Sequence, residues 1–350
     1  ATAVSAMTSP RPPIEAGRLG RDLREVLCII RLYQCPILCP MNQGVQVSGS
    51  STLSQWAQQA AEAMLRADLF FGHGTATAFD EACWMLSHVL DLPPDFDDAM
   101  LTEALEPAQA ETLDRLLRRR IETRKPLAYL IGEAWFAGLR FRVDENTLVP
   151  RSPLAELIVG GLLPWLDLAR PLRVLDVGTG SGCIAASLAW HWPALRVDAT
   201  DVSPAALAVA RDNVAGLGLA DRVRVIESDV YAGLDSSGEG QARYDLIVSN
   251  PPYVPELSMT ALPEEYRHEP ALALRAGEDG LDIVRRLLAG APEHLSASGF
   301  LLLEVGEAQP ATEAMLGETA AIWLEFEHGG EGVVLLDRAA CLQWRMEQGT

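Results

Sequence analysis

The residues best suited to chemistry stand together at Asn250, Pro251, Pro252 and Tyr253, directly after the apolar run 244–249. An asparagine amide oxygen and a backbone carbonyl oxygen can each accept one N–H of a planar NH2 group. Two prolines restrict φ and donate no hydrogen bond, so the carbonyls of such a loop keep their direction. The tyrosine ring adds an aromatic wall for a flat group or a sulfonium methyl. These four residues are the predicted catalytic residues of a site that holds an amide or amino nitrogen.

A glycine-rich turn, residues 176–182, follows an earlier apolar run and reads D-V-G-T-G-S-G. A dinucleotide-binding turn needs G-x-G-x-x-G, with its third glycine where this chain has Cys183. Asp176 stands two residues before the first glycine, and its charge would repel a pyrophosphate. Both departures disfavour NAD and suit S-adenosylmethionine, which carries an amine and no phosphate. The glycines allow the backbone to approach such a cofactor closely.

Carboxylates follow the next two apolar runs. Asp201 closes the second run, where an acid hydrogen-bonds ribose hydroxyls in doubly wound folds. Asp229 and Val230 follow the third run, where an aspartate can receive an adenine amino group. The predicted cofactor-binding residues are therefore Asp176, Gly178, Thr179, Gly180, Ser181, Gly182, Asp201, Asp229, Val230 and Asn250.

The charge balance limits the partners. The chain has 48 acidic residues against 28 lysines and arginines, a formal net charge of −20. Such a field opposes DNA, whose binding rests on cationic contacts to phosphates, and it attracts a basic protein. No run approaches the roughly 20 apolar residues of a membrane helix, so no membrane partner is expected. The six cysteines form no C-x-x-C pair and no zinc-finger spacing, which predicts no metal and fits a reducing cytoplasm.

The length of 350 residues favours about two domains of roughly 150 residues each. Residues 1–50 are expected to be a disordered tail, or coding read upstream of a start at Met7 or Met41. Helical periodicity then predicts a substrate-recognition domain over 51–130, a β-hairpin linker over 131–150 and a catalytic domain over 151–345. In the helical domain, Thr77 or Asp80 is the expected cap of the second helix.

Short apolar runs alternate with helical segments after Pro150. This alternation predicts an α/β fold with a parallel, Rossmann-like sheet that carries helices on both faces. The expected strands are 172–177, 195–200, 223–227, 244–249 and 300–305. Two last runs, 322–326 and 332–336, flank a glycine-rich turn and predict an antiparallel C-terminal hairpin at the sheet edge.

Some charged residues are assigned no catalytic role. His73 and His268 stand in polar segments, where His268 could contact a substrate. The basic stretch 115–125 consists of Arg115, Arg118, Arg119, Arg120, Arg124 and Lys125. It is expected to be a solvated helix face, with contact to ribosomal RNA as the alternative.

Over residues 52–340 the chain resembles the glutamine side-chain methyltransferases that act on translation proteins. One branch of that family resembles the release-factor enzyme and the other the enzyme for ribosomal protein L-three. The second branch matches the segments 149–157, 265–270, 72–75 and 323–326. The resemblance implies a methyltransferase fold, S-adenosylmethionine as cofactor, and methylation of one glutamine of ribosomal protein L-three before or during large-subunit assembly.

The same resemblance implies roles for the residues already singled out. Asn250 and the Pro251 carbonyl would hold the glutamine amide, with Tyr253 packed beside it, and the N-terminal helices would recognise the protein substrate. Three alternatives stay open. The enzyme could act on release factors; it could be a DNA adenine methyltransferase, which would need a basic target-recognition region; or it could be a non-catalytic assembly factor that binds the cofactor.

Overall fold

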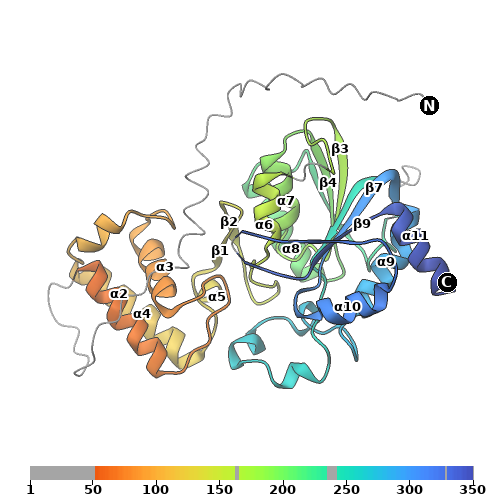
Figure 1. Ribbon diagram of the computed structural model, residues 1–350. Helices are drawn as coiled ribbons and strands as arrows, with labels where there is room; N and C mark the ends of the chain where they lie inside the picture. Colours follow the sequence, from red (N-terminus) through yellow and green to blue (C-terminus); the bar gives the residue numbers. More distant parts are fainter. Residues whose placement is uncertain (1–51, 162–164, 235–242, 328, 350) are drawn as a thin grey trace, which may run out of the picture.

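The computed structural model describes residues 52–161, 165–234, 243–327 and 329–349. A helical part lies to one side of an α/β part in Figure 1. The expectation for residues 1–50 lies outside the described residues. The expected α/β fold with an antiparallel C-terminal hairpin and a small N-terminal helical part is confirmed by the arrangement that follows.

The helical part packs around one apolar core. Its elements are α2 (Leu53–Arg66), α3 (Ala78–Leu90), the 3-10 helix η2 (Asp98–Thr102), α4 (Pro107–Thr123) and α5 (Leu127–Ile131). Thr52 and Gln55 form a capping box at the start of α2. Thr77, rather than Asp80, caps α3, because its hydroxyl oxygen accepts the Asp80 N–H at 3.1 Å. Buried residues of several helices, Trp56, Met85 and Leu113 among them, form the core.

The predicted hairpin links the two parts. Strands β1 (Glu133–Phe136) and β2 (Leu139–Arg142) pair antiparallel, with Phe136 opposite Leu139. The two residues between them, Ala137 and Gly138, have φ of +48° and +76°, as a tight hairpin turn of matching twist requires. Asn213 then fastens the hairpin to the α/β part, because its side chain bonds both the N–H and the carbonyl oxygen of Arg142.

The α/β part contains a seven-stranded sheet of order β5-β4-β3-β6-β7-β9-β8. Strands β3 to β7 are parallel, and β9 runs antiparallel to both β7 and β8, so the C-terminal hairpin closes one edge of the sheet. The strands are β3 (Leu172–Val177), β4 (Leu195–Asp201), β5 (Val223–Glu227), β6 (Tyr244–Ser249), β7 (Leu295–Glu304), β8 (Ile322–Leu324) and β9 (Val333–Asp337).

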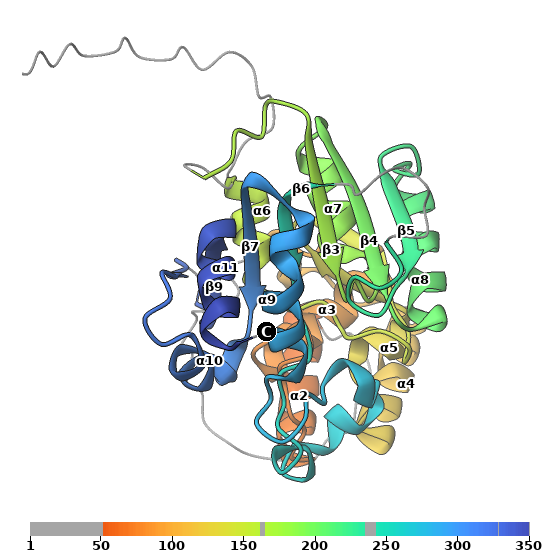
Figure 2. The same ribbon diagram turned by 90° about the vertical axis from the view of Figure 1, so that its right-hand side faces the viewer.

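Helices cover both faces of the sheet (Figure 2). One face packs against α6 (Leu154–Gly160), α7 (Cys183–His191) and α8 (Pro204–Gly216), and the other against α9 (Asp282–His294), α10 (Gln309–Leu316) and α11 (Arg338–Glu347). Neighbouring strand residues point to opposite faces, so Val174 belongs to the first core and Leu175 to the second. Helix α11 lay beyond the sequence-based expectations.

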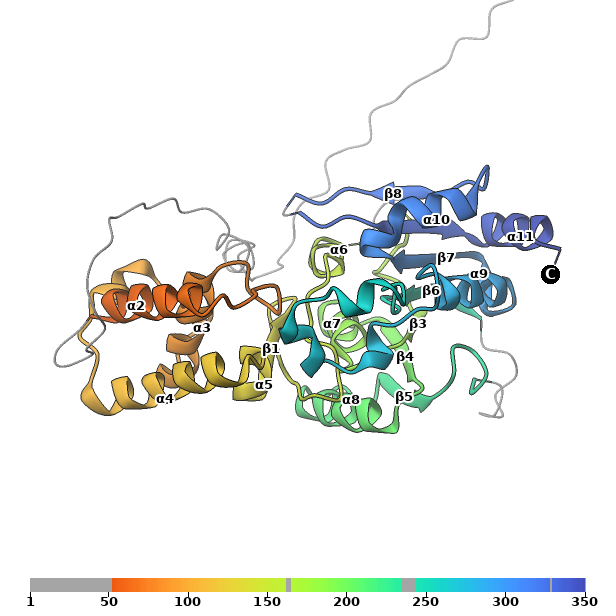
Figure 3. The ribbon, with the colours of Figure 1, turned by 90° about the horizontal axis from the view of Figure 1, so that it is seen from below.

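The strand order decides where the site lies. The chain runs outward from β3 to β4 and β5, and then returns to place β6 on the other side of β3. Ligands bind outside the carboxyl ends of parallel strands at such a switch point. The segment between β6 and α9 contains the 3-10 helices η4 (Ser258–Thr260), η5 (Glu264–His268) and η6 (Ala271–Ala273). Figure 3 shows this segment at the junction of the helical and α/β parts.

Candidate active site

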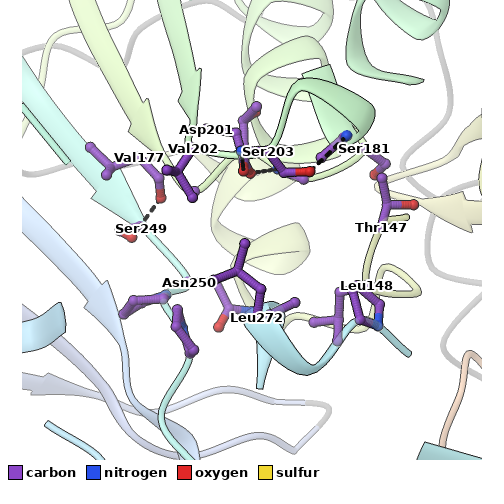
Figure 4. A pocket seen from close by; sticks show the side chains of 18 of the residues that line it. Thr147, Leu148, Val177, Ser181, Asp201, Val202, Ser203, Ser249, Asn250 and Leu272 are labelled. Carbon is purple, nitrogen blue, oxygen red and sulfur yellow. Dashed lines mark hydrogen bonds between the residues drawn. The ribbon is translucent and has the colours of Figure 1, made fainter. Parts of the chain in front are cut away.

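One cavity opens at the carboxyl ends of β3, β4, β5 and β6. Its lining comes chiefly from residues 146–152, 177–181, 201–203, 228–230 and 249–252. In Figure 4, Asp201, Val202 and Ser203 border one side, and Asn250 and Leu272 border the side across from them. The cavity therefore brings the glycine turn, both strand-end carboxylates and the Asn250 loop together, as the sequence predicted for a single site.

The three glycines of the turn have different surroundings. All have positive φ, +73° at Gly178, +56° at Gly180 and +80° at Gly182. A Cβ added at Gly178 or Gly180 would meet no atom within 4 Å, so open space lies beside the backbone there. A Cβ at Gly182 would lie 3.2 Å from the Cβ of Ala210. Gly182 does not line the cavity; it allows α7 to pack closely on α8.

Asp176 lies behind the turn and not in the cavity lining. Its Oδ2 accepts hydrogen bonds from Thr179 Oγ1 at 2.6 Å and from the Ala185 N–H at 3.2 Å. Oδ1 is buried and has no hydrogen-bond partner among the described residues. Burial raises the pKa of this carboxyl to about 7. The side chain supports the shape of the turn through Thr179, which does line the cavity.

Asp201 lines the cavity and braces the turn. Its Oδ2 accepts the Gly180 N–H and its Oδ1 accepts the Ser203 N–H, each at 2.9 Å. A carboxylate oxygen has two lone pairs, so both oxygens keep acceptor capacity for a ligand hydroxyl.

Asp229 and Val230 form the next part of the lining. Asp229 is exposed, and its Oδ1 lies 2.8 Å from Nη2 of Arg286. Val230 has φ of +54°, a conformation that costs a β-branched residue free energy and is typical of functional sites. Ser228 holds this conformation: its hydroxyl donates to the Val230 carbonyl and accepts the Gly233 N–H, both at 2.8 Å.

Some residues of the loop after β6 line the cavity, and others pack against the protein core. Asn250, Pro251 and Pro252 line the cavity, whereas Tyr253 does not. The Tyr253 ring lies across Gly306, where an added Cβ would come within 2.9 Å of Cζ. Burial raises the pKa of Tyr253 to about 12. Tyr253 therefore supports the loop by packing against the protein on the side away from the cavity.

Glu304, at the end of β7, is a residue that the sequence analysis missed. It is 4% exposed, its carboxylate accepts a hydrogen bond from the Ser152 hydroxyl, and it lies beside Asn250 at the ends of two paired strands. Burial raises its pKa to about 7. The sequence shows a glutamate at the end of an apolar strand, which could have suggested a site residue. Its position beside Asn250 depends on the strand order and cannot be seen in the sequence.

Buried ion pairs attach the segment after β6 to the rest of the molecule. Arg151, which lines the cavity, bonds both carboxylate oxygens of Glu269, with Nη2–Oε2 at 2.7 Å. His73 is buried rather than exposed, with Nε2 3.5 Å from Glu269 Oε2, and burial lowers its pKa. Burial alone would raise the pKa of Glu269, but the nearby His73 ring and the hydrogen-bonded Arg151 guanidinium bring it down to about 2.

The expected solvated arginine face is wrong for Arg120. This residue is 0% exposed, and its Nε donates to Glu81 Oε1 at 2.7 Å. Arg124 reaches Glu265 of the segment after β6 at 2.8 Å. His268 lies outside the cavity lining, with Nε2 3.0 Å from the Thr123 carbonyl oxygen. These contacts join α4 of the helical part to the segment that follows the Asn250 loop.

The described residues contain neither a membrane-spanning helix nor a cluster of metal ligands. No helix there is long and apolar enough to cross a bilayer. No group of three or more histidine, cysteine, aspartate or glutamate side chains in the same residues could hold a metal ion.

Comparison with known proteins agrees with this site. A model of the methyltransferase small domain matches residues 161–265, and a model of the PrmC N-terminal domain matches residues 57–132. The ribosomal protein uL3 glutamine methyltransferase of Bordetella pertussis is 45% identical over 82% of this chain and 95% of its own. The protein of the same name from Xanthomonas campestris is 46% identical over 77% of this chain and 86% of its own. The resemblance inferred from the sequence is confirmed: this chain is a methyltransferase that belongs to the family of ribosomal protein uL3 glutamine methyltransferases.

Proposed function

We propose that the enzyme transfers a methyl group from S-adenosylmethionine to the side-chain amide nitrogen of one glutamine in ribosomal protein uL3. The observation that carries this proposal is the single cavity shared by the open glycine turn and the Asn250–Pro252 loop. A methyl donor and a nitrogen acceptor must meet within one water-excluding site. One side of this cavity suits the donor and the opposite side suits the acceptor.

The residues on the β3, β4 and β5 side fit the cofactor. The open space beside Gly178 and Gly180 would admit its methionine portion close to the backbone. The remaining acceptor capacity of Asp201 suits ribose hydroxyls, and Asp229 with the Val230 N–H suits the edge of an adenine ring. When bound, the cofactor supplies an electrophilic methyl group on a positively charged sulfur. Asp176, Thr179, Ser181 and Gly182 then support or complete the turn.

The Asn250 loop fits the acceptor. Asn250 Oδ1 and the Pro251 carbonyl oxygen would accept the two N–H bonds of the glutamine amide. This grip turns the nitrogen lone pair out of conjugation and aims it at the cofactor side of the cavity. The main contribution is positioning, and the extra proton leaves once the nitrogen carries positive charge.

The protein substrate fits the charge of the enzyme. A chain with net charge −20 attracts a basic ribosomal protein and repels DNA. The helical part (52–130) and the segment after β6 would recognise that protein, as free uL3 or in an assembling large subunit, in the cytoplasm. The buried pairs through Arg151, Glu269 and Arg124 hold both recognising segments against the cavity.

Competing substrates test the proposal. The enzyme is incubated with tritiated cofactor and, separately, with purified uL3, a peptide release factor and duplex DNA, and the methylated peptide is located by mass spectrometry. The expected result is one modified glutamine in uL3. Label in the release factor, or in DNA with none in protein, would replace the proposed substrate, and cofactor binding without transfer to any of the three would favour an assembly factor.

A further inference from the structure

Glu304 and Asn250 occupy matching positions at one edge of the sheet. Strands β6 and β7 are parallel, and Ser249 pairs with Leu303, so the next residue of each strand is Asn250 and Glu304. The Glu304 carboxylate lies close enough to the Asn250 side chain for that side chain to lower its pKa, and the Ser152 hydroxyl donates to Oε2 of the same carboxylate. Glu304 does not line the cavity, so it reaches a substrate only through Asn250.

The chemistry of the two side chains makes this contact directional. An asparagine amide has an acceptor oxygen at one side and a donor NH2 at the other, and only one of its two flips suits a given site. An ionised carboxylate accepts hydrogen bonds and donates none. The Asn250 NH2 group must therefore face Glu304, which turns Oδ1 toward the cavity. Oδ1 is the atom that a substrate NH2 group requires.

We propose that Glu304 is a positioning residue that selects the flip of the Asn250 amide in which Oδ1 faces the cavity, and that Ser152 holds Glu304 in place for this purpose. This inference rests on the proposed function. It adds a specificity element, because an acceptor oxygen fixed in this direction favours an NH2 substrate and rejects a group without N–H bonds.

Protonation of Glu304 would reverse the selection. A neutral carboxyl group can donate to Asn250 Oδ1, which favours the opposite flip. The groups that face Glu304 are Arg151 and Ser152 from the segment before α6, and Asn250 and Tyr253 from the loop after β6. Because burial raises the Glu304 pKa to about 7, turnover should fall as the pH drops through about 7.

The first test replaces Glu304 with glutamine, which keeps the shape but can face Asn250 with either an oxygen or an NH2 group. We expect kcat to fall about tenfold, with cofactor affinity unchanged and the decline below pH 7 abolished. Glu304→Leu leaves the Asn250 NH2 without its partner and should lower kcat about 10- to 100-fold. The matched control is Glu318→Gln, an exposed glutamate beyond α10, which should keep wild-type kcat and pH dependence.

The second test exchanges the two functional groups. Asn250→Asp places two carboxylates against each other and should nearly abolish transfer. In Asn250→Asp/Glu304→Gln, the introduced glutamine NH2 can donate to one oxygen of the introduced carboxylate and leave the other oxygen facing the cavity. The double variant should be at least about tenfold more active than Asn250→Asp alone, a coupling that independent residues would not show. If Glu304→Gln is inactive and the exchange restores nothing, the carboxylate has another role and the positioning proposal is overturned.

A third measurement does not depend on turnover. In protein with 15N-labelled asparagine side chains, the Asn250 NH2 signal is identified by its loss in Asn250→Asp. We expect it to titrate near pH 7 in the wild type and to be insensitive to pH in Glu304→Gln. A signal that ignores pH in both proteins overturns the Glu304 proposal. A wild-type protein that shows the titration but methylates no glutamine overturns the proposed function instead.

Discussion

The Ser249 hydroxyl donates a hydrogen bond to the Val177 carbonyl oxygen at 2.6 Å. Val177 precedes the glycine turn at the end of β3, and Ser249 precedes Asn250 at the end of β6. Val177 and Ser249 are also backbone partners in the pairing of β3 with β6, so this buried bond reinforces the joint between the cofactor side and the acceptor side of the cavity (Figure 4). The distance between the glycine turn and the Asn250 loop is therefore fixed by contacts within the sheet and not by long, flexible side chains.

Ser249→Ala should weaken the connection between the ends of β3 and β6 without removing any group that contacts the substrate or the cofactor. Loss of one buried hydrogen bond should lower the free energy of unfolding by about 1 kcal/mol. We expect kcat to fall more than the cofactor affinity, since each half of the site is kept but their spacing is loosened. Urea unfolding and steady-state kinetics measure both quantities; a lower cofactor affinity at unchanged kcat would contradict this assignment.

Asn250→Ala removes the oxygen that holds the substrate amide. Transfer should fall on the order of 100- to 1000-fold, the usual effect of deleting one group that stabilises a transition state. Cofactor affinity should stay within about threefold of the wild type, because the glycine turn and Asp201 are untouched. Single-turnover kinetics and calorimetric titration separate the two effects. A wild-type transfer rate in this variant would disprove the amide grip.

Gly178→Ala and Gly182→Ala form a matched pair in the glycine turn. Both positions have φ near +75°, at +73° and +80°, so each alanine should cost about 1–2 kcal/mol of backbone strain. Only the Gly182 Cβ would also press on Ala210, at 3.2 Å, and that contact should add about 1–3 kcal/mol. The Gly178 Cβ instead enters open space that the cofactor would use. Thermal unfolding should therefore rank Gly182→Ala as less stable, and cofactor titration should rank Gly178→Ala as weaker binding; the reverse order would contradict both assignments.

Arg120→Met should be strongly destabilising, because it leaves the buried carboxylate of Glu81 without its partner. Loss of one member of a buried pair costs about 3–5 kcal/mol. The double variant Arg120→Met/Glu81→Leu removes both charges and should recover most of the loss. Denaturant midpoints of the three proteins measure this. A double variant as unstable as the single one would show that Arg120 acts mainly through the Phe70 carbonyl, to which its Nη2 donates at 3.1 Å.

Buried carboxyl groups give the stability an unusual pH dependence. The folded-state pKa of Glu304 is about 7 against an ordinary 4.5, so the folded protein binds more protons than the unfolded chain between these values. Its contribution is complete below pH 4.5 and is lost as the pH rises through about 7, on the order of 3 kcal/mol. Asp176, with a pKa of about 7, acts in the same direction.

Glu269 acts oppositely, since its pKa of about 2 makes its contribution disappear as the pH falls from 4.5 through 2. Glu304→Gln should remove the part of the stability loss between pH 4.5 and 7 that comes from Glu304. The loss of stability below pH 4.5, which comes from Glu269, should be unchanged. Unfolding free energies measured from pH 3 to 8 test this. An unaltered decline in the variant would exclude Glu304 as a source of it.

Local patterns in the sequence determined most of the strands, the cofactor turn and the Asn250 loop. Strands β3, β5 and β6 begin and end where the apolar runs do, because a buried parallel strand needs apolar side chains on both faces. Helix α11 was not predicted, although Asp337 caps it and Ala340, Cys341 and Trp344 form an apolar face at helical spacing.

The tertiary structure alone decided which residues meet. Asp176 and Gly182 belong to the predicted turn, yet they face the protein interior, and Tyr253 lies across Gly306. Glu304 gains its place beside Asn250 only because β7 lies next to β6. The position of Arg120 in its helix predicts exposure to solvent, but in the structure its side chain is buried against Glu81. The periodicity of a chain reports which side chains are buried or exposed, whereas a partner distant in sequence is fixed by strand order and packing, which no single segment encodes.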